Sequence, residues 1–374
     1  MGLINQYCLL RSLRIMVNWR LTLSFEDGGF RDNTADTTCG HFSLEHLTPP
    51  TLQIVRNIIS DVMLDIPYYM TPRFHKKMID AVIREANRVY HLWCINNPGF
   101  AHRGRVHIIG HSLGSVMAMD ILSNQPTKVH QDRDIANLIP NELPADHLVF
   151  DVYNLFLVGS PAGLFLFLNG SSLVPRQGRK NSATEDPDDG ILVHVAGRRG
   201  TYGCLAVDNV YNIVHPCDPV ALCLNATVDV DYAATLKLAS VPSASMPWFS
   251  TPSFWHSATS MEKVGDKTLE PVNVAELGPS VQQNAHNYTP EEISERKAFE
   301  LNDNGQIDYM LSGVGGPLEV QYVTMLTAHM SYWSNRDFVR TLVREIGRRP
   351  GREGTILSMR AQRKETVPSC SDKA

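Results

Sequence analysis

One stretch decides the fold, the sequence VHIIGHSLGS at residues 106–115. A short apolar run rich in β-branched residues ends abruptly at a Gly-x-Ser-x-Gly pentapeptide, and an apolar stretch compatible with a helix follows. The pattern predicts a strand, a sharp turn and a helix over residues 106–122, which is the arrangement of a nucleophile elbow. Such a turn holds the hydroxyl of Ser112 clear of the sheet, so Ser112 is the candidate nucleophile.

The neighbours of Ser112 fit this interpretation. Gly110 and Gly114 lie two positions on either side of it, where we expect a Cβ atom to strike the neighbouring strand or helix. The backbone N–H of Leu113, at the start of the helix, is expected to stabilise an oxyanion. His111 adjoins the serine, and we assign it a supporting or oxyanion-side role rather than that of the base.

Composition limits the class of protein. With 374 residues the chain can bury a large core, and a single α/β-hydrolase-type domain reaches this length, although length alone allows two domains. The net charge of −5 argues against nucleic acid as the main partner. The seven cysteines are odd in number and form no C-x-x-C pair, which is typical of a reduced, intracellular protein and gives no zinc site. We expect no metal and no other cofactor.

Hydrophobic patterning predicts an α/β fold with a mainly parallel sheet. Near-continuous apolar runs predict strands at 153–158, 207–214 and 307–311, and a further strand candidate lies at 14–19. Helical spacing of apolar residues predicts helices over 50–66, 72–93 and 337–347, with a short one at 290–299. We therefore expect a hydrolase domain over 14–347, with mobile inserts at about 171–190 and 240–305, and a basic and polar tail over 348–374.

A serine nucleophile needs an acid and a base, which follow it in the chain order Ser, Asp, His in this fold. Asp218 comes directly after the strand predicted at 207–214, within the sequence His-Pro-Cys-Asp-Pro-Val. His329 lies near the carboxyl terminus and is the candidate base. The alternatives are a turn-forming aspartate before a proline and a core or capping histidine.

The oxyanion hole is incomplete in the sequence. One donor normally comes from a loop after an early strand, and no such segment precedes the strand candidate at 14–19. Loss of one donor costs about 10²–10³ in kcat. Either another loop supplies the second donor, or the chain is truncated at its N-terminus relative to the active form.

Five segments resemble a known family. They are GHSLGS at 110–115, LVGSPAGLF at 157–165, NIVHPCDPVA at 212–221, GQIDYML at 305–311 and HMSYW at 329–333. In this order they resemble the DDHD-domain, phosphatidic-acid-preferring intracellular phospholipases. The resemblance runs from about residue 14 to 347, and its four named positions fall on Asp218, Asp308, His329 and Asp337. His-x-x-Tyr-Trp and Asp-Pro-Val also resemble secreted fungal-type lipases.

The resemblance implies an α/β-hydrolase-like fold and calcium-independent hydrolysis of the sn-1 acyl ester of a glycerophospholipid at a membrane surface. It also implies peripheral association with Golgi, endoplasmic reticulum or mitochondrial membranes, and it leaves the oligomeric state unknown. The family usually continues the acid motif with Tyr-Arg, where this chain has Leu222-Cys223. Candidate membrane contacts are the aromatic stretch at 246–255 and the basic tail.

Two other functions remain open at this point. One is a non-catalytic lipid-binding or membrane-trafficking module of the same fold, in which the four named positions bind a metal. The other is an esterase or acyltransferase that acts on neutral lipids.

Overall fold

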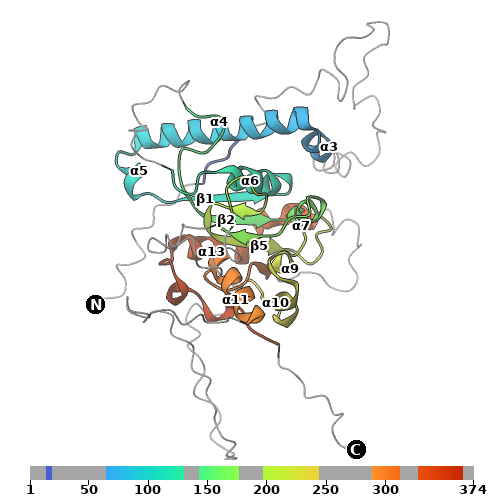
Figure 1. The fold of residues 1–374 in the computed structure, drawn as a ribbon. Coiled ribbons are helices and arrows are strands. Elements are labelled where there is room, and N and C mark those ends of the chain that lie inside the picture. Colours follow the sequence, from blue (N-terminus) through green and yellow to red (C-terminus); the bar gives the residue numbers. More distant parts are fainter. Residues whose placement is uncertain are drawn as a thin grey trace, which may run out of the picture.

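The computed structural model describes residues 14–18, 65–129, 143–176, 197–243, 289–311 and 327–364. In this part of the chain a central sheet of four parallel strands has the order β1-β2-β5-β6. The strands are β1 (Val106–His111), β2 (Val152–Val158), β5 (Val207–Val214) and β6 (Asp308–Met310). Helices lie on both sides of the sheet (Figure 1), so the predicted α/β fold is confirmed.

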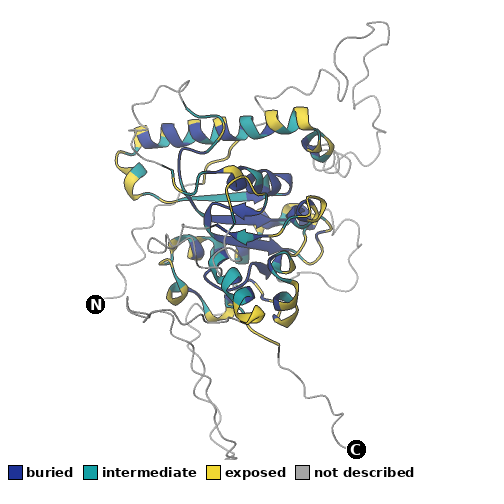
Figure 2. Ribbon diagram, viewed as in Figure 1, coloured by how far each residue is buried: buried dark blue, intermediate teal, exposed yellow. Residues whose placement is uncertain are grey.

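Burial follows the position of each strand in the sheet. Nearly every residue of β2 and β5 is buried, as expected for parallel strands covered on both faces. Five of the six residues of β1 are only partly buried, because β1 lies at the edge of the described sheet. Figure 2 shows this gradient from the buried centre to the exposed helices.

The register of the strands brings the site together. His111 of β1 pairs with Val158 of β2, and Val158 pairs with Ile213 of β5. These residues are the last or the last but one of their strands. Because the strands are parallel, the residues that follow all three emerge at the same edge of the sheet, where ligands bind in open α/β folds.

Two helices cover the face of the sheet at the top of Figure 1. α4 (Pro72–Asn96) begins with a proline in its first turn, as predicted, and α6 (Leu113–Asn124) lies between α4 and the strands. α11 (Pro290–Leu301) contributes Leu301 to the core cluster on the α6 side, whereas α13 (Arg336–Gly347) packs through Phe338 near Phe156 of β2, on the opposite face. The helix predicted at 290–299 is confirmed, and a complete capping box between Thr289 and Glu292 starts it.

The remaining elements are short. They are α3 (Asp65–Met70), α5 (Phe100–Arg103), α7 (Ala162–Leu168), β3 (Val174–Pro175), β4 (Cys204–Leu205), α9 (Asn225–Val228), α10 (Val230–Thr235) and the 3₁₀ turns η5 (Tyr332–Ser334), η6 (Arg352–Gly354) and η7 (Leu357–Met359).

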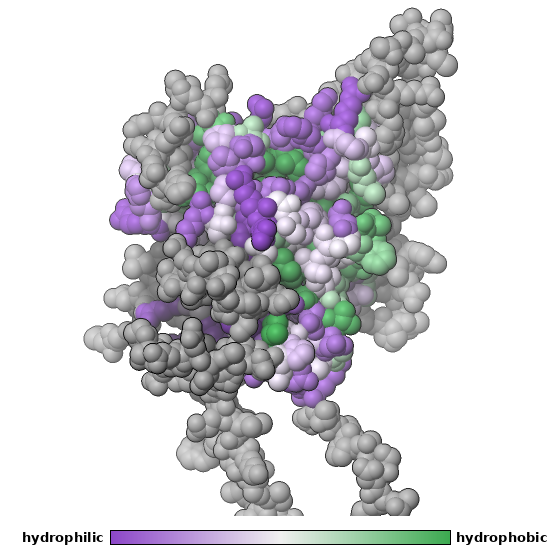
Figure 3. Space-filling model, viewed as in Figure 1, coloured by the Kyte–Doolittle hydropathy of each residue, from purple (hydrophilic) through white to green (hydrophobic). Residues whose placement is uncertain are grey.

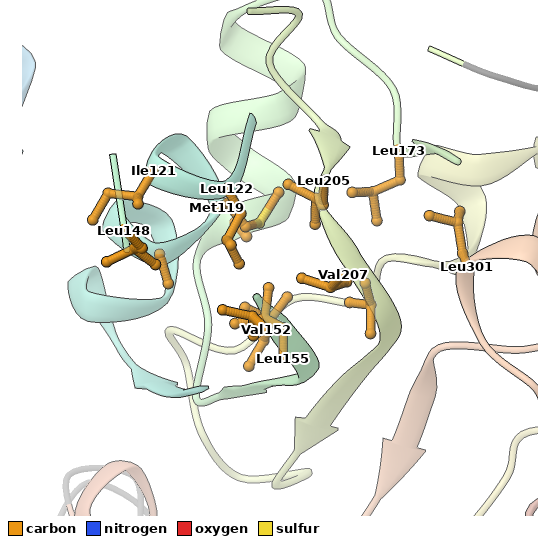
Figure 4. Close-up of a cluster of buried hydrophobic side chains, with 14 of the residues drawn as sticks. Met119, Ile121, Leu122, Leu148, Val152, Leu155, Leu173, Leu205, Val207 and Leu301 are labelled. Carbon is orange, nitrogen blue, oxygen red and sulfur yellow. The ribbon is translucent and has the colours of Figure 1, made fainter. Parts of the chain in front are cut away.

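The main core cluster lies between α6 and the sheet (Figure 4). Met119 and Leu122 of α6 face Leu155 of β2, and all three side chains are fully buried. At the end of α6 the buried guanidinium of Arg176 donates to the backbone carbonyls of Leu122, Ser123, Gln125 and Cys204. This cation satisfies carbonyl groups that have no partner inside the helix, and it fixes the end of the helix that begins at the elbow.

Some predicted segments differ or lie outside the described residues. Residues 14–18 are exposed and form no strand. The helix predicted at 50–66 lies largely outside the described residues, as do 177–196 and 244–288 of the two predicted inserts, with the aromatic stretch at 246–255. Residues 348–364, which the sequence assigns to the tail, pack on the domain: Met359 is fully buried, and residues 361 and 362 hydrogen-bond with the backbone of 304 and 237.

Candidate active site

Ser112 lies in a strained turn between β1 and α6. Its φ is 52° and its ψ is −129°, and among the described residues it is the one non-glycine residue with a positive φ. A positive φ in a residue with a Cβ costs about 1–3 kcal/mol and persists where the surroundings impose it. The predicted strand, sharp turn and helix are therefore present in the structure, with Ser112 at the turn.

The two glycines of the pentapeptide differ. A Cβ on Gly110 would lie 2.6 Å from the Cα of Ser115, so the predicted close approach of strand and helix requires this glycine. A Cβ on Gly114 would meet nothing within 4 Å. The steric reason given for Gly114 is therefore wrong, because this residue is on an open side of the first helical turn.

The candidate oxyanion donor lies at the start of α6. Leu113 is the first residue of α6, so its N–H has no partner within the helix. Within the described residues β1 pairs with β2 and with no strand on its other side. The strand that carries the second donor in α/β hydrolases is not among these residues.

Asp218 and His329 form a buried pair. Nδ1 of His329 lies 3.0 Å from both carboxylate oxygens of Asp218, and the side chains are 3% and 0% exposed. Asp218 follows β5 in a turn closed by its N–H bond to the carbonyl of His215. His329 lies in a helical turn over 327–331. The two residues are 111 positions apart in the sequence.

The surroundings of Asp218 keep it charged. Burial raises its pKa, but donors from His329, from the Val220 N–H and from the hydroxyl of Tyr332 outweigh burial and hold the pKa below its ordinary value. A carboxylate accepts and cannot donate, so Nδ1 of His329 carries the proton. This tautomer leaves the lone pair of Nε2 available to take a proton.

Gly159 shows where the elbow, the acid and the base meet. The N–H of Ser112 donates to the carbonyl of Val158, at 3.0 Å. A Cβ on the next residue, Gly159, would lie 2.9 Å from Oδ2 of Asp218 and 3.2 Å from Cε1 of His329. Among the described residues, the buried Oγ of Ser112 and the buried Nε2 of His329 have no hydrogen-bond partner. These are the two atoms between which a serine hydrolase transfers a proton, and within the described residues neither is engaged in another hydrogen bond.

His111 contacts the backbone of His329. Its Nε2 lies 2.8 Å from the carbonyl oxygen of His329, and the two rings are 4.7 Å apart. A carbonyl only accepts, so Nε2 carries a proton. Burial lowers the pKa of His111, so this ring is neutral with Nε2 committed to the backbone. The arrangement agrees with the supporting role expected for it.

Asp308 and Asp337 have different surroundings. Asp308 is buried at the start of β6 and accepts from the amide of Asn212 and from the N–H groups of Leu224 and Asn225. Burial outweighs these donors and raises its pKa. Asp337 lies in the first turn of α13. Within the described residues no group of three or more His, Cys, Asp or Glu side chains is arranged to hold a metal ion.

Two residues of the site, Gly159 and Tyr332, are not singled out by the sequence. They occur there only within the segments at 157–165 and 329–333 that resemble the family. The hydroxyl of Tyr332 lies 2.8 Å from Oδ2 of Asp218. Its spacing of three residues from His329 within a helical segment was the available signal.

An apolar surface lies beside this edge of the sheet. α7 begins three residues after Gly159 and exposes Leu164, Phe167 and Leu168, with 80% of Phe167 accessible. Gly163 of α7 packs against Leu222, which is 39% exposed in the loop after Asp218. Figure 3 shows hydrophobic atoms gathered over α7, at the right of the view. Among the described helices, none has the length and apolar character needed to cross a membrane.

Known proteins with similar sequences were found over most of the chain. A protein of Schizosaccharomyces pombe named probable phospholipase, mitochondrial, is 29% identical over 337 residues, which cover 81% of this chain and 40% of the relative. A Saccharomyces cerevisiae protein named probable phospholipase, mitochondrial, is 26% identical over 88% of this chain and 40% of its own. Human triacylglycerol hydrolase DDHD2 is 33% identical over 117 residues, 30% of this chain and 16% of its own.

The chain spans about 40% of the length of the two yeast relatives. No solved structure matches it. The family model of the DDHD domain matches residues 148–277 and 274–347, more than half of the 374 residues. These segments contain Asp218, Asp308, His329 and Asp337, the four positions at which the resemblance was placed. The chain belongs to the DDHD domain family.

Proposed function

We propose that this chain is a serine hydrolase that cleaves the sn-1 acyl ester of phosphatidic acid or a related glycerophospholipid. The observation that carries the proposal is the buried pair of Asp218 and His329 beside a strained serine, with Oγ of Ser112 and Nε2 of His329 both uncommitted. Two relatives named phospholipases support the lipid class.

The geometry suggests a two-step mechanism. Nε2 of His329 takes the proton of Ser112 as its Oγ attacks the ester carbonyl, and Asp218 stabilises the imidazolium that forms. The N–H of Leu113 donates to the oxyanion. The imidazolium gives its proton to the leaving lysolipid oxygen, which leaves an acyl-enzyme. His329 then activates a water molecule, which releases the fatty acid.

Two measurements on the chain test this proposal. Ser112→Ala should lower turnover of phosphatidic acid by about 10⁶ and abolish labelling by a fluorophosphonate probe. Ser123→Ala is the matched control, because the hydroxyl of this buried serine of α6 bonds to backbone groups: it donates to the carbonyl of Met119 and accepts from the N–H of Gly203. Wild-type turnover in Ser112→Ala would overturn the proposal, and a wild-type protein that neither labels nor turns over lipid would favour the non-catalytic module.

A neutral-lipid substrate is the second candidate. It is favoured by the name of the DDHD2 relative and by Leu222-Cys223, which puts no cation where the family usually has an arginine. The ratio of kcat/KM for phosphatidic acid and for triacylglycerol, measured in the same micelles, separates the two. A ratio well below one assigns the site to neutral lipids, and Ser112 keeps its role in either case.

The proposal includes peripheral contact with a lipid surface, for which the exposed side chains of α7 are the support. Phe167→Ser should reduce co-sedimentation with phosphatidic-acid vesicles, whereas Val343→Ser, at a 52% exposed valine of α13, should not. Equal binding by both variants would remove α7 from the proposal. The names of the two yeast relatives favour mitochondria as the location, and a tagged full chain that never co-localises with mitochondria would exclude it.

A further inference from the structure

Tyr332 is the first residue of η5, directly after the helical turn that carries His329. Residues three apart on a helical segment lie on the same face, so both side chains point toward the edge of the sheet where β5 ends. The side chain of Tyr332 is fully buried. A Cβ on Gly159 would lie 3.0 Å from its ring carbon Cε2, so this glycine makes room for the ring.

The hydroxyl of Tyr332 makes two hydrogen bonds, and their directions are fixed. It accepts from the backbone N–H of His215, at 2.9 Å, and a backbone N–H cannot accept. Its own proton therefore goes to Oδ2 of Asp218, at 2.8 Å. Burial and the charge of Asp218 both raise the pKa of Tyr332, so the hydroxyl remains a donor throughout the physiological pH range.

These two bonds hold both ends of the turn that presents the acid. The N–H of His215 marks where the chain leaves β5, and the Asp218 carboxylate is the functional end of the turn. On the other side of the carboxylate, Oδ1 accepts from the N–H of Val220, at 2.9 Å. With one donor on each oxygen, the plane of the carboxylate is fixed and faces His329, whose Nδ1 is 3.0 Å from each oxygen.

We propose that Tyr332 is a positioning residue, whose hydroxyl orients the Asp218 carboxylate and keeps it charged so that His329 can act as the base. The proposal rests on the proposed serine hydrolase function. The hydroxyl of Tyr332 bonds to the His215 N–H and to Asp218, so its effect on the reaction passes through Asp218. An ordinary core tyrosine would instead contribute only to packing and stability.

Tyr332→Phe removes the hydroxyl and keeps the ring. A hydrogen bond to a charged group contributes about 1.5–3 kcal/mol, so we expect kcat to fall about 10-fold to 100-fold with little change in KM. Tyr309→Phe is the matched control: this tyrosine of β6 is also fully buried, and its hydroxyl donates to the carbonyl of Gln306, away from Asp218. Its kcat should stay within about twofold of the wild type.

The pH profile separates positioning from packing. Without the Tyr332 hydroxyl, the carboxylate of Asp218 is less stabilised, so the pair that it forms with His329 binds a proton more tightly. The acidic limb of the profile of kcat/KM against pH should therefore move to higher pH in Tyr332→Phe and stay in place in Tyr309→Phe.

The same substitution made in the Asp218→Asn variant completes the test. If the hydroxyl acts through the charge of Asp218, Tyr332→Phe should change kcat less than about twofold when Asp218→Asn is already present. Equal losses in both backgrounds, or an unmoved acidic limb, would overturn the proposal. If the single variant is too inactive for its kcat to be measured, the same comparison of single and double variants by thermal unfolding tests the coupling. Fluorophosphonate labelling of the wild type reports separately on Ser112. Failure of the proposed hydrolase function is therefore distinguished from failure of the positioning role of Tyr332.

Discussion

Two networks of buried polar side chains use the same strands in different ways. At the carboxyl ends, Asp218 and His329 pair beside Ser112, and the Oγ of Ser112 and Nε2 of His329 have no partner among the described residues. Toward the amino ends, Arg348 lies 2.8 Å from Asp303 and 2.6 Å from Glu345. An unmade buried hydrogen bond costs about 1–3 kcal/mol. Among those residues the first network leaves these two functional atoms without a partner, whereas in the second network the unpaired atom is Oε1 of Glu345, whose other oxygen is bonded to Arg348.

The second network closes the carboxyl end of α13. The guanidinium of Arg348 also donates to the hydroxyl of Tyr211, which in turn donates to Glu345, and Gly351 donates from its backbone to Asp303. Each charge faces an opposite charge at 10% exposure or less. The difference teaches that burial of charge alone does not mark the site. What distinguishes the candidate site, within the described residues, is a buried acceptor and a buried hydroxyl without hydrogen-bond partners, next to a residue with a positive φ.

Among the substitutions that compare the two networks, the largest effect is expected at Asp218. Asp218→Asn keeps the shape but offers His329 an amide, so the tautomer with a free Nε2 is lost, and kcat for phosphatidic acid should fall about 10⁴-fold with a small change in the free energy of unfolding. Asp120→Asn in α6, whose carboxylate bonds to Tyr69 and His75, is the control and should keep kcat within a few-fold. Equal losses in both would remove the special place given to the first network.

Arg348→Met should have the opposite signature. It leaves Glu345 and Asp303 buried without their cation, which costs about 3–5 kcal/mol of the free energy of unfolding, while the folded fraction keeps its kcat. Arg363→Met is the control: the pair of Arg363 with Glu295 is 53% and 40% exposed and contributes about 0–1 kcal/mol. Denaturant unfolding and active-site titration measure the two quantities. A loss of kcat in Arg348→Met with an unchanged free energy of unfolding would contradict the prediction, because it would show that the second network affects catalysis.

Lowering the pH should reduce the free energy of unfolding through His107 of β1. Burial, with a smaller effect from Arg105, lowers the pKa of His107 to about 4, and its Nδ1 is another buried atom without a partner. Between pH 6.5 and 4 the unfolded chain therefore binds more protons than the folded chain. The contribution of His107 to the free energy of unfolding is therefore fully present above pH 6.5. As the pH falls toward 4, the free energy of unfolding decreases by roughly 3 kcal/mol. His107→Phe should flatten that part of the curve, and an unchanged slope would contradict the assignment.

The parts of the molecule that the sequence predicts are those encoded locally. The elbow at 106–122, the strand at 207–214 and the order Ser112, Asp218, His329 each depend on a short motif or on chain order. The bond between Tyr332 and Asp218 joins residues 114 positions apart, and the bond between Arg348 and Asp303 joins residues 45 positions apart. No local pattern reports such pairs. The strand candidate at 14–19 failed in its described part because extended residues become a strand only with a partner.

The smallest effect tests the strain at the elbow itself. Ser112→Gly removes both the hydroxyl and the Cβ that makes a φ of 52° costly, so the free energy of unfolding should rise by about 1 kcal/mol. Ser112→Ala removes the hydroxyl but keeps the strain, so the difference between the two variants in denaturant unfolding measures the strain that glycine relieves less the extra backbone entropy that glycine loses on folding. If glycine is less stable than alanine by the full entropy difference of about 0.5–1 kcal/mol, the turn stores no strain. The first network would then lose stability only through its unpaired polar atoms, and the comparison with Arg348 would reduce to hydrogen bonding.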